Sequence, residues 1–168
     1  MRAHYGDVAQ LVEQRTENPC VGGSIPSITT NNFNTVQMKT PRYRKVLLID
    51  DNEIDNFINE RMITSSHFAQ EVVVKNSADA ALDFLRTVTD DASCPEIIFL
   101  DLNMPVKDGF GFLTDYEEMP SLVKDKCKIV VLSSSISPED INKASTNPHV
   151  FKYVNKPLSE KYLEAILL

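Results

Sequence analysis

Five short apolar runs, each followed by a stretch that reads as a helix, constrain the fold of this chain more than any other feature. The runs are Val46–Ile49, Val72–Val74, Ile97–Leu100, Ile129–Leu132 and Val150–Val154. Near-continuous apolar residues are typical of strands that are buried on both faces. This alternation of strands and helices predicts an α/β fold, a doubly wound five-stranded parallel sheet with helices on both faces. Among the right-handed arrangements, the flavodoxin-like strand order 2-1-3-4-5 is favoured.

The helices are predicted from apolar stripes and from polar residues at their starts. The first helix carries a stripe of Ile54, Phe57, Ile58 and Met62 at helical spacing. The later helices are predicted to start at Ser77, Asp108, Ser137 and Ser159. Pro138, at the first helical position after Ser137, strengthens the fourth start signal because its ring already holds a helical φ.

The first forty residues do not share this pattern. Residues 1–40 are rich in Gly, Ser, Thr and Asn and have few periodic apolar positions, which predicts a disordered leader before a folded domain at 41–168. Val8–Gln14 and Gly23–Pro26 also resemble the translated D-arm and T-arm of a transfer-RNA gene. The hypothesis is that residues 1–37 are a gene-start misannotation and that the native chain begins near Met38, and the alternative is a genuine leader. Sequencing the native N-terminus separates the two, because Met1 at that position contradicts the hypothesis.

Charge and cysteine content narrow the function classes. The net charge is −7, and residues 41–168 hold 14 basic against 21 acidic side chains, which argues against a direct contact with nucleic acid through a basic face. No apolar run approaches the roughly eighteen residues of a membrane span, and the N-terminus lacks a secretory signal. The three cysteines are odd in number and lack metal-like spacing, so reduced thiols and a cytoplasmic location are expected.

Polar groups follow four of the five predicted strands. Asp50 and Asp51 follow the first strand, Asp101 the third, and Ser133 the fourth, while Lys156 comes shortly after the fifth. Ligands of an open parallel sheet bind outside the carboxyl ends of its strands, so these groups are expected to lie together. Three carboxylates in one place repel unless a divalent cation holds them, and oxygen ligands favour Mg²⁺ or Mn²⁺ over Zn²⁺. Each residue taken singly also has a structural explanation, as a helix cap, a polar loop or a solvated charge.

Four segments, in this order, resemble the receiver domain of two-component response regulators. They are Leu48–Asn52, Leu100–Pro105 with Asp108-Gly109, Val131–Ser134 and Tyr153–Pro157. The resemblance covers about residues 45–168. It implies a stand-alone response regulator that receives a phosphoryl group from the phosphohistidine of a sensor histidine kinase or of a histidine phosphotransfer protein. The downstream target would be a protein that the sequence does not identify.

The resemblance also assigns roles to residues. Asp101 would be the phosphoacceptor. Asp50, Asp51 and Asp101, with the backbone carbonyl of Asn103, would hold Mg²⁺ or Mn²⁺. Ser133 and Lys156 would bind the phosphoryl group. Ser134 is an alternative to Ser133, because the interval from Ser133 to Lys156 is one residue longer than the family pattern.

A conformational switch is part of the same resemblance. An inward shift of Ser133 would vacate space for Tyr153 to turn in, and the surface of the fourth helix, fifth strand and fifth helix would change. The alternative for Tyr153 is a half-exposed aromatic of the sheet. The peptide bond before Pro157 is expected to be cis.

Two other functions stay open. The first is a phosphatase or phosphotransferase with an aspartyl nucleophile, but such enzymes need a second acid two residues after the nucleophile, where this chain has Asn103. The second is a pseudo-receiver that acts only as a docking module, against which the acids, hydroxyl and lysine argue. We therefore expect a signalling phosphoacceptor that promotes only its own phosphorylation and dephosphorylation.

Overall fold

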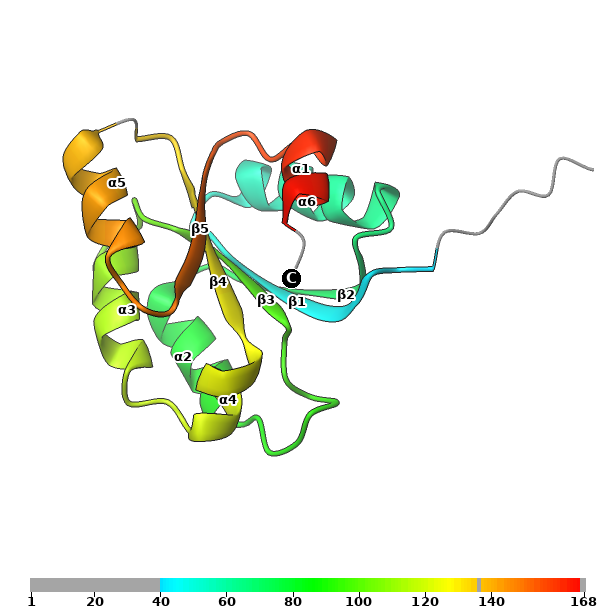
Figure 1. Ribbon diagram of the computed structural model, residues 1–168, viewed down its shortest axis with the longest axis horizontal. Helices are drawn as coiled ribbons and strands as arrows, with labels where there is room; N and C mark the ends of the chain where they lie inside the picture. Colours follow the sequence, from blue (N-terminus) through cyan, green and yellow to red (C-terminus); the bar gives the residue numbers. More distant parts are fainter. Residues whose placement is uncertain (1–39, 136, 167–168) are drawn as a thin grey trace, which may run out of the picture. The chain divides into compact units, whose positions relative to one another are not determined.

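The computed structural model of the protein describes residues 40–135 and 137–166. The predicted leader, except for its last residue, and the transfer-RNA hypothesis lie outside these ranges. The strands are β1 (Tyr43–Ile49), β2 (Ala69–Lys75), β3 (Ile97–Asp101), β4 (Lys128–Ser133) and β5 (Val150–Asn155). They form one parallel sheet in the order β2-β1-β3-β4-β5 (Figure 1). The predicted fold and strand order are confirmed.

The described residues contain six helices. They are α1 (Glu53–Ser65), α2 (Ala78–Arg86), α3 (Gly109–Tyr116), α4 (Ser121–Lys126), α5 (Pro138–Ser145) and α6 (Glu160–Ala165). Helices α1 and α6 cover one face of the sheet, and α2 to α5 cover the other (Figure 1). The predicted N-cap positions of α2, α3, α5 and α6 are confirmed. Helix α4 was not predicted, because Pro120 interrupts the pattern after α3, so the fourth and fifth predicted helices are α5 and α6. No helix of the described ranges combines the length and the apolar character that a bilayer span requires.

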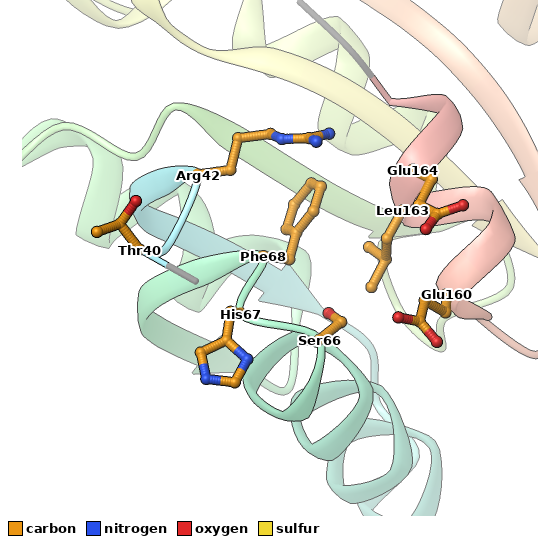
Figure 2. Close-up of a pocket in the computed structure, with 8 residues that line it drawn as sticks. All are labelled: Thr40, Arg42, Ser66, His67, Phe68, Glu160, Leu163 and Glu164. Atoms are coloured by element: carbon orange, nitrogen blue, oxygen red, sulfur yellow. The ribbon is translucent and has the colours of Figure 1, made fainter. Parts of the chain in front are cut away.

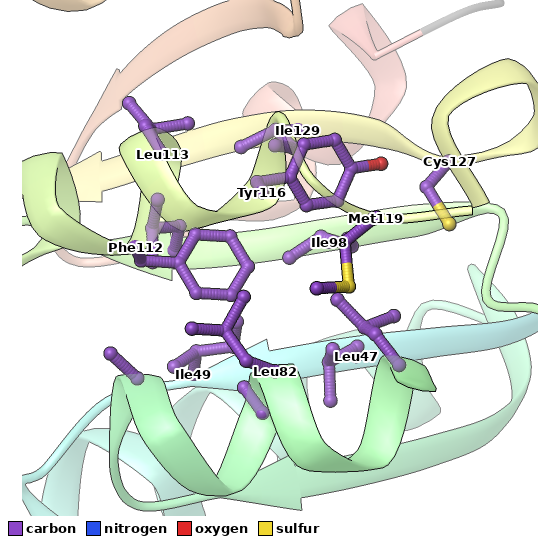
Figure 3. Packing of buried hydrophobic residues seen from close by; sticks show 14 of the residues in the cluster. Leu47, Ile49, Leu82, Ile98, Phe112, Leu113, Tyr116, Met119, Cys127 and Ile129 are labelled. Carbon is purple, nitrogen blue, oxygen red and sulfur yellow. The ribbon is translucent and has the colours of Figure 1, made fainter. Parts of the chain in front are cut away.

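The sheet separates two hydrophobic clusters. Side chains alternate between the faces of a strand, so Leu47 and Ile49 of β1 pack toward α2 and α3, whereas Val46 and Leu48 pack toward α1 and α6. Figure 3 shows the first cluster, in which the ring of Tyr116 lies among aliphatic side chains. Full burial of a large apolar side chain stabilises the fold by about 1.5–3 kcal/mol, so these clusters hold the strand ends in place.

Three of the four residues in the apolar stripe of α1 face solvent, and only Met62 packs against the core. Ile54, Phe57 and Ile58 are 69%, 60% and 46% exposed. The buried face of α1 consists of Asn56, Asn59 and Ile63. Helical spacing predicts that apolar residues share a face, but it does not say which way that face points. The result is an exposed apolar surface on a helix that begins directly after the Asp50-Asp51 pair.

The interval between Ser133 and Lys156 contains a β-bulge in β5. The pairing of β4 with β5 shifts by one residue at Phe151, and Ser133 then lies opposite Asn155, the residue before Lys156. A bulge absorbs one residue on one strand and leaves the rest of the ladder in register. The carboxyl end of β5 therefore stays level with that of β4, in spite of the longer interval.

Two of the three cysteines lie in the described ranges. Cys94 and Cys127 are buried, free thiols, and their Sγ atoms are 3.5 Å apart. Burial raises the pKa of both thiols, so the protonated form dominates at neutral pH. The expectation of reduced thiols stays a prediction, and Cys20 lies outside the described residues.

Candidate functional site

Three carboxylates converge at the carboxyl ends of two neighbouring strands. Asp50 and Asp51 follow β1, and Asp101 ends β3, which pairs directly with β1. One carboxylate oxygen from each of the three lies within 4.8 Å of the others. Asp50 and Asp101 are buried, whereas Asp51 is exposed to solvent. The structure thus brings the three predicted acids together, with one side of the cluster open.

Lys156 reaches this cluster from the segment after β5. Its Nζ atom lies 2.6 Å from Oδ2 of Asp50 and 3.1 Å from Oδ2 of Asp101. Burial by itself lowers the pKa of Lys156, but the hydrogen bonds to Asp50 and Asp55 and the charge of Asp101 outweigh burial and raise the pKa above its usual value. Lys156 therefore stays protonated at neutral pH. The Lys156–Pro157 peptide bond is cis, as the resemblance implies.

The turn from β1 into α1 fixes the position of Asp50. The backbone N–H of Asn52 donates to Oδ1 of Asp50 at 3.0 Å, and Nδ2 of Asn56 donates to the Asp50 carbonyl at 2.7 Å. Burial raises the pKa of Asp50, and repulsion from Asp101 adds to this, although hydrogen bonds from Lys156 and Asn52 oppose the shift. A buried carboxylate that is crowded in this way gains from every added positive charge.

One oxygen of Asp101 lacks a protein partner. Its Oδ1 atom is buried and accepts no hydrogen bond from the residues that the structure describes. A buried acceptor without a partner costs about 1–3 kcal/mol, and more if it is charged, unless a ligand satisfies it. With Asp50 and Asp51 beside it, the carboxylate of Asp101 completes an all-oxygen donor set, which fits Mg²⁺ or Mn²⁺.

The structure distinguishes the two candidate serines. Ser133 is the last residue of β4 and is buried, and its Oγ accepts from Nδ2 of Asn103 at 3.4 Å and from the N–H of Ser135 at 3.1 Å. Ser134 is exposed. Asn103 follows Asp101 by two residues, so the contact links the β3 and β4 ends and favours Ser133 for the hydroxyl role. The direction of the Asn103 carbonyl stays a prediction.

Tyr153 connects β5 to the turn that follows β4. Its ring is partly buried against the core, and its hydroxyl donates to the Ser135 carbonyl at 2.7 Å. The hydroxyl of Ser135 in turn donates to Asp140 at 2.8 Å and accepts from the N–H of Ser137 at 3.1 Å. Since the N–H of Ser135 also bonds Ser133, one turn links the candidate hydroxyl to the candidate aromatic switch.

Three residues that contact the site were not identified from the sequence. Asp55 binds Lys156 Nζ at 2.9 Å, Asn56 binds the Asp50 backbone, and Ser135 joins Ser133 to Tyr153. An acid in the first turn of a helix is common because it complements the helix dipole, so nothing marked Asp55 as a partner of a distant lysine. Asn56 lies on the buried face of α1, and the spacing of apolar residues did not predict that this polar face points toward the sheet.

A separate cavity lies at the amino-terminal ends of β1 and β2, at the opposite end of these strands from the acid cluster. Its volume is about 300 Å³, and residues before β1 and β2 line it with residues of α6 (Figure 2). Arg42 and Phe68 lie on one side and Glu160 and Glu164 on the other. Ligands of parallel sheets bind at the carboxyl ends of the strands, so the acid cluster is the better candidate for the functional site.

Known proteins share both this sequence pattern and this fold. Residues 46–168 match the family model of the response regulator receiver domain. Response regulator Rcp1 of Synechocystis sp. is 30% identical over 120 residues, which cover 70% of this chain and 80% of that protein. A two-component response regulator from Cytophaga hutchinsonii has a crystal structure with a TM-score of 0.68 and 34% identity, over 73% of this chain and 92% of that one. The crystal structure of the phosphorylated cyanobacterial phytochrome response regulator RcpA has a TM-score of 0.59 and 32% sequence identity. The match covers 74% of this chain and 88% of that one.

Proposed function

Since the chain belongs to the response regulator receiver domain family, we propose that Asp101 accepts a phosphoryl group from the phosphohistidine of a sensor histidine kinase or histidine phosphotransfer protein. The observation that carries the proposal is the buried carboxylate of Asp101, whose Oδ1 has no partner among the described residues and which lies close to an acid pair and a charged lysine. We propose that the reaction takes place in the cytoplasm. We also propose that the receiver domain comprises residues 41–168.

The transfer is one displacement at phosphorus. A carboxylate oxygen of Asp101 forms the new P–O bond, the P–N bond of the phosphohistidine breaks, and its electron pair returns to the imidazole. Asp50, Asp51 and Asp101, with the Asn103 carbonyl, would hold Mg²⁺ or Mn²⁺, which when bound neutralises charge on the phosphoryl group. Lys156, already 3.1 Å from Asp101, pairs with a phosphoryl oxygen.

Signalling requires that the new charge moves a surface. We assign this step to Ser133, which would move toward the phosphoryl group, and to Tyr153. The hydroxyl of Tyr153 bonds the Ser135 carbonyl, so a movement of the loop after β4 would move Tyr153 as well. The surface formed by α5, β5 and α6 then changes, and an unidentified protein target reads it. A direct contact with nucleic acid or membrane is not part of the proposal. The new group carries close to two negative charges and strong acceptor oxygens, which is enough to bias such a two-state element.

Replacing Ser133 by Ala is expected to keep phosphorylation but to uncouple the surface. Hydrogen exchange of β5 should change on phosphorylation in the wild-type protein, and this change should be lost in Ser133→Ala, because the hydroxyl that follows the phosphoryl group is missing. Ser134→Ala is the matched control and should respond as wild type does. The opposite outcome, with only Ser134→Ala uncoupled, would assign the hydroxyl role to Ser134.

The exposed stripe of α1 is the proposed docking surface for the phosphohistidine protein. Such a partner must bring its histidine to Asp101 and therefore covers the surface beside the site. Ile58 lines the same small cavity as Lys156, and Phe57 is 60% exposed. Several exposed apolar residues that lie together on one helix mark an interaction site more often than single, scattered ones do.

Phe57→Ala is expected to slow phosphotransfer from a phosphorylated histidine phosphotransfer protein by at least about tenfold, because a buried aromatic anchor often dominates an interface. Its rate with acetyl phosphate should stay within about twofold of wild type, since a small donor needs no docking surface. Phe151→Ala, which truncates an exposed aromatic on β5, should leave both rates unchanged. Equal losses with both donors would show damage to the site rather than to docking.

Incubation with Mg²⁺ and acetyl phosphate, followed by intact mass measurement, tests the proposed function. A single phosphoryl adduct that is stable in acid, labile in base and abolished by a chelator is expected. Continuous release of phosphate with many turnovers would favour the phosphatase or phosphotransferase. Absence of any adduct would favour the docking module.

A further inference from the structure

We propose that Asp55 is a positioning residue for Lys156, which it holds in the unphosphorylated protein and must release before the lysine can follow the phosphoryl group. This inference rests on the proposed function and deepens it. Asp55 would act through Lys156 and would not touch the reacting atoms. Its effect is to favour the resting state over the phosphorylated state.

Three carboxylates surround the ammonium group of Lys156, which donates hydrogen bonds to Asp50 and Asp55 and forms an ion pair with Asp101. The ammonium group has three N–H donors, and its Nζ lies 2.6 Å from Asp50, 2.9 Å from Asp55 and 3.1 Å from Asp101. The lysine side chain is only 13% exposed, so solvent does little to replace these bonds. A tighter contact with a phosphoryl oxygen on Asp101 therefore requires that one of the other two carboxylates yields.

Asp55 is the partner that yields at the lower cost. The Asp50 side chain is 1% exposed, and its other oxygen is already bonded by the Asn52 N–H, so water cannot readily replace Lys156 there. The Asp55 side chain is 36% exposed, so water can satisfy it once the lysine leaves. Ion pairs with an exposed partner are weak, so a new dianion can displace this one.

The surroundings allow the lysine to move. A small open cavity lies directly beside Lys156 and Asp55. The other residues that line it are Ile58, Asn59, Ser134 and Pro157. Asp55 itself is held by the start of α1, because the side chain of Asn52 accepts from its backbone N–H at 3.3 Å. The backbone of Asp55 is thus fixed at the start of a helix, whereas the long side chain of Lys156 has space to move away from Asp55.

Charge acts in the same direction. Asp55 adds a fourth carboxylate to a site that must accept a phosphoryl dianion, so its charge opposes the phosphorylated state. Removing the charge frees one donor of Lys156 and reduces repulsion, and both effects stabilise the phosphorylated form. A helix-capping role for Asp55, in contrast, would alter stability without altering affinity for a phosphoryl mimic.

The test is the affinity of the whole chain for beryllium fluoride, a phosphoryl mimic, at saturating Mg²⁺. Asp55→Asn is expected to bind it about three- to fivefold more tightly than wild type. Asp55→Glu keeps the charge and should return the affinity toward wild type. The matched control is Glu53→Gln, which removes an equal charge in the same helical turn from an exposed side chain that forms no ion pair with the described residues. The control should stay within about twofold of wild type.

A double-mutant cycle shows whether Asp55 acts through the lysine. In a Lys156→Gln background, Asp55→Asn should change the affinity by less than twofold. An unchanged or weaker affinity of Asp55→Asn, or an equal gain in both backgrounds, would overturn the inference. If wild type itself fails to bind beryllium fluoride in Mg²⁺, the proposed function fails instead, so the two failures are distinguishable.

Discussion

Asp101→Asn should form no phosphoryl adduct with acetyl phosphate and Mg²⁺, a loss of at least roughly a hundredfold in rate, because an amide cannot replace the carboxylate nucleophile. The substitution also removes the negative charge of one of the three acids whose oxygens lie within 4.8 Å of one another, so Mg²⁺ affinity should fall with it. Intact mass and Mg²⁺ titration measure the two effects. The fold should survive, since the amide keeps the shape of the acid and relieves repulsion with Asp50.

The matched control is Asp125→Asn. Asp125 is an exposed acid of α4. This helix leads into the amino-terminal end of β4, whereas the acid cluster lies at the carboxyl ends of the strands. The control removes the same charge and should form the adduct at the wild-type rate. An adduct that persists in Asp101→Asn while wild type and control behave alike would show that another residue is the acceptor.

Gly109→Ala should destabilise the protein by about 3 kcal/mol and impair phosphorylation as well. A Cβ atom at this position would lie 2.6 Å from the Asp101 carbonyl oxygen and 2.8 Å from Cα of Leu102. These are backbone atoms, so they cannot move aside without shifting β3 or the loop after it, and such overpacking costs several kcal/mol in the worst cases. Because the strained carbonyl belongs to Asp101, the rate of adduct formation should fall by at least about tenfold. Urea unfolding and the acetyl phosphate assay measure the two quantities.

Gly111→Ala is the control for this substitution. Its Cβ would lie 2.8 Å from Cγ of Lys107, which is a side-chain atom rather than a backbone atom, although ion pairs with Asp79 and Asp115 hold the far end of that lysine. Alanine is also favoured over glycine inside a helix by about 1 kcal/mol, so the two terms nearly cancel. The control should change stability by less than about 1 kcal/mol. Equal stability of the two variants would contradict the close packing of Gly109 on the end of β3.

The fold was predictable because its signals are local. Each buried strand is a short apolar run, and each later helix begins at a polar cap, so Ser77 and Asp108 marked α2 and α3 correctly. Helix α4 and the outward stripe of α1 were missed for different reasons. Pro120 precedes α4 and separates it from α3, so the short second helix was not predicted, whereas in α1 the direction of the face that carries Phe57 is set by long-range contacts that spacing does not contain.

The site was predictable to the extent that strand ends define it. Asp50, Asp51 and Asp101 follow from the sheet order alone, because parallel strands end at one edge. Asp55 and Ser135 depend on side-chain reach and on the path of a turn, and no short motif encodes either. The one-residue excess before Lys156 was visible in the sequence, but the bulge of β5 within that interval was not.

Chemical mapping of the acyl phosphate tests the central claim most directly. The protein is phosphorylated in Mg²⁺, treated with borohydride to reduce the acyl phosphate to an alcohol, and digested, and the peptides are sequenced by mass spectrometry. The expected result is one reduced residue, at position 101, and none when the metal is chelated. Reduction at Asp50, Asp51 or Asp55, or label that forms equally well without the metal, would contradict the claim that Asp101 is the metal-dependent acceptor.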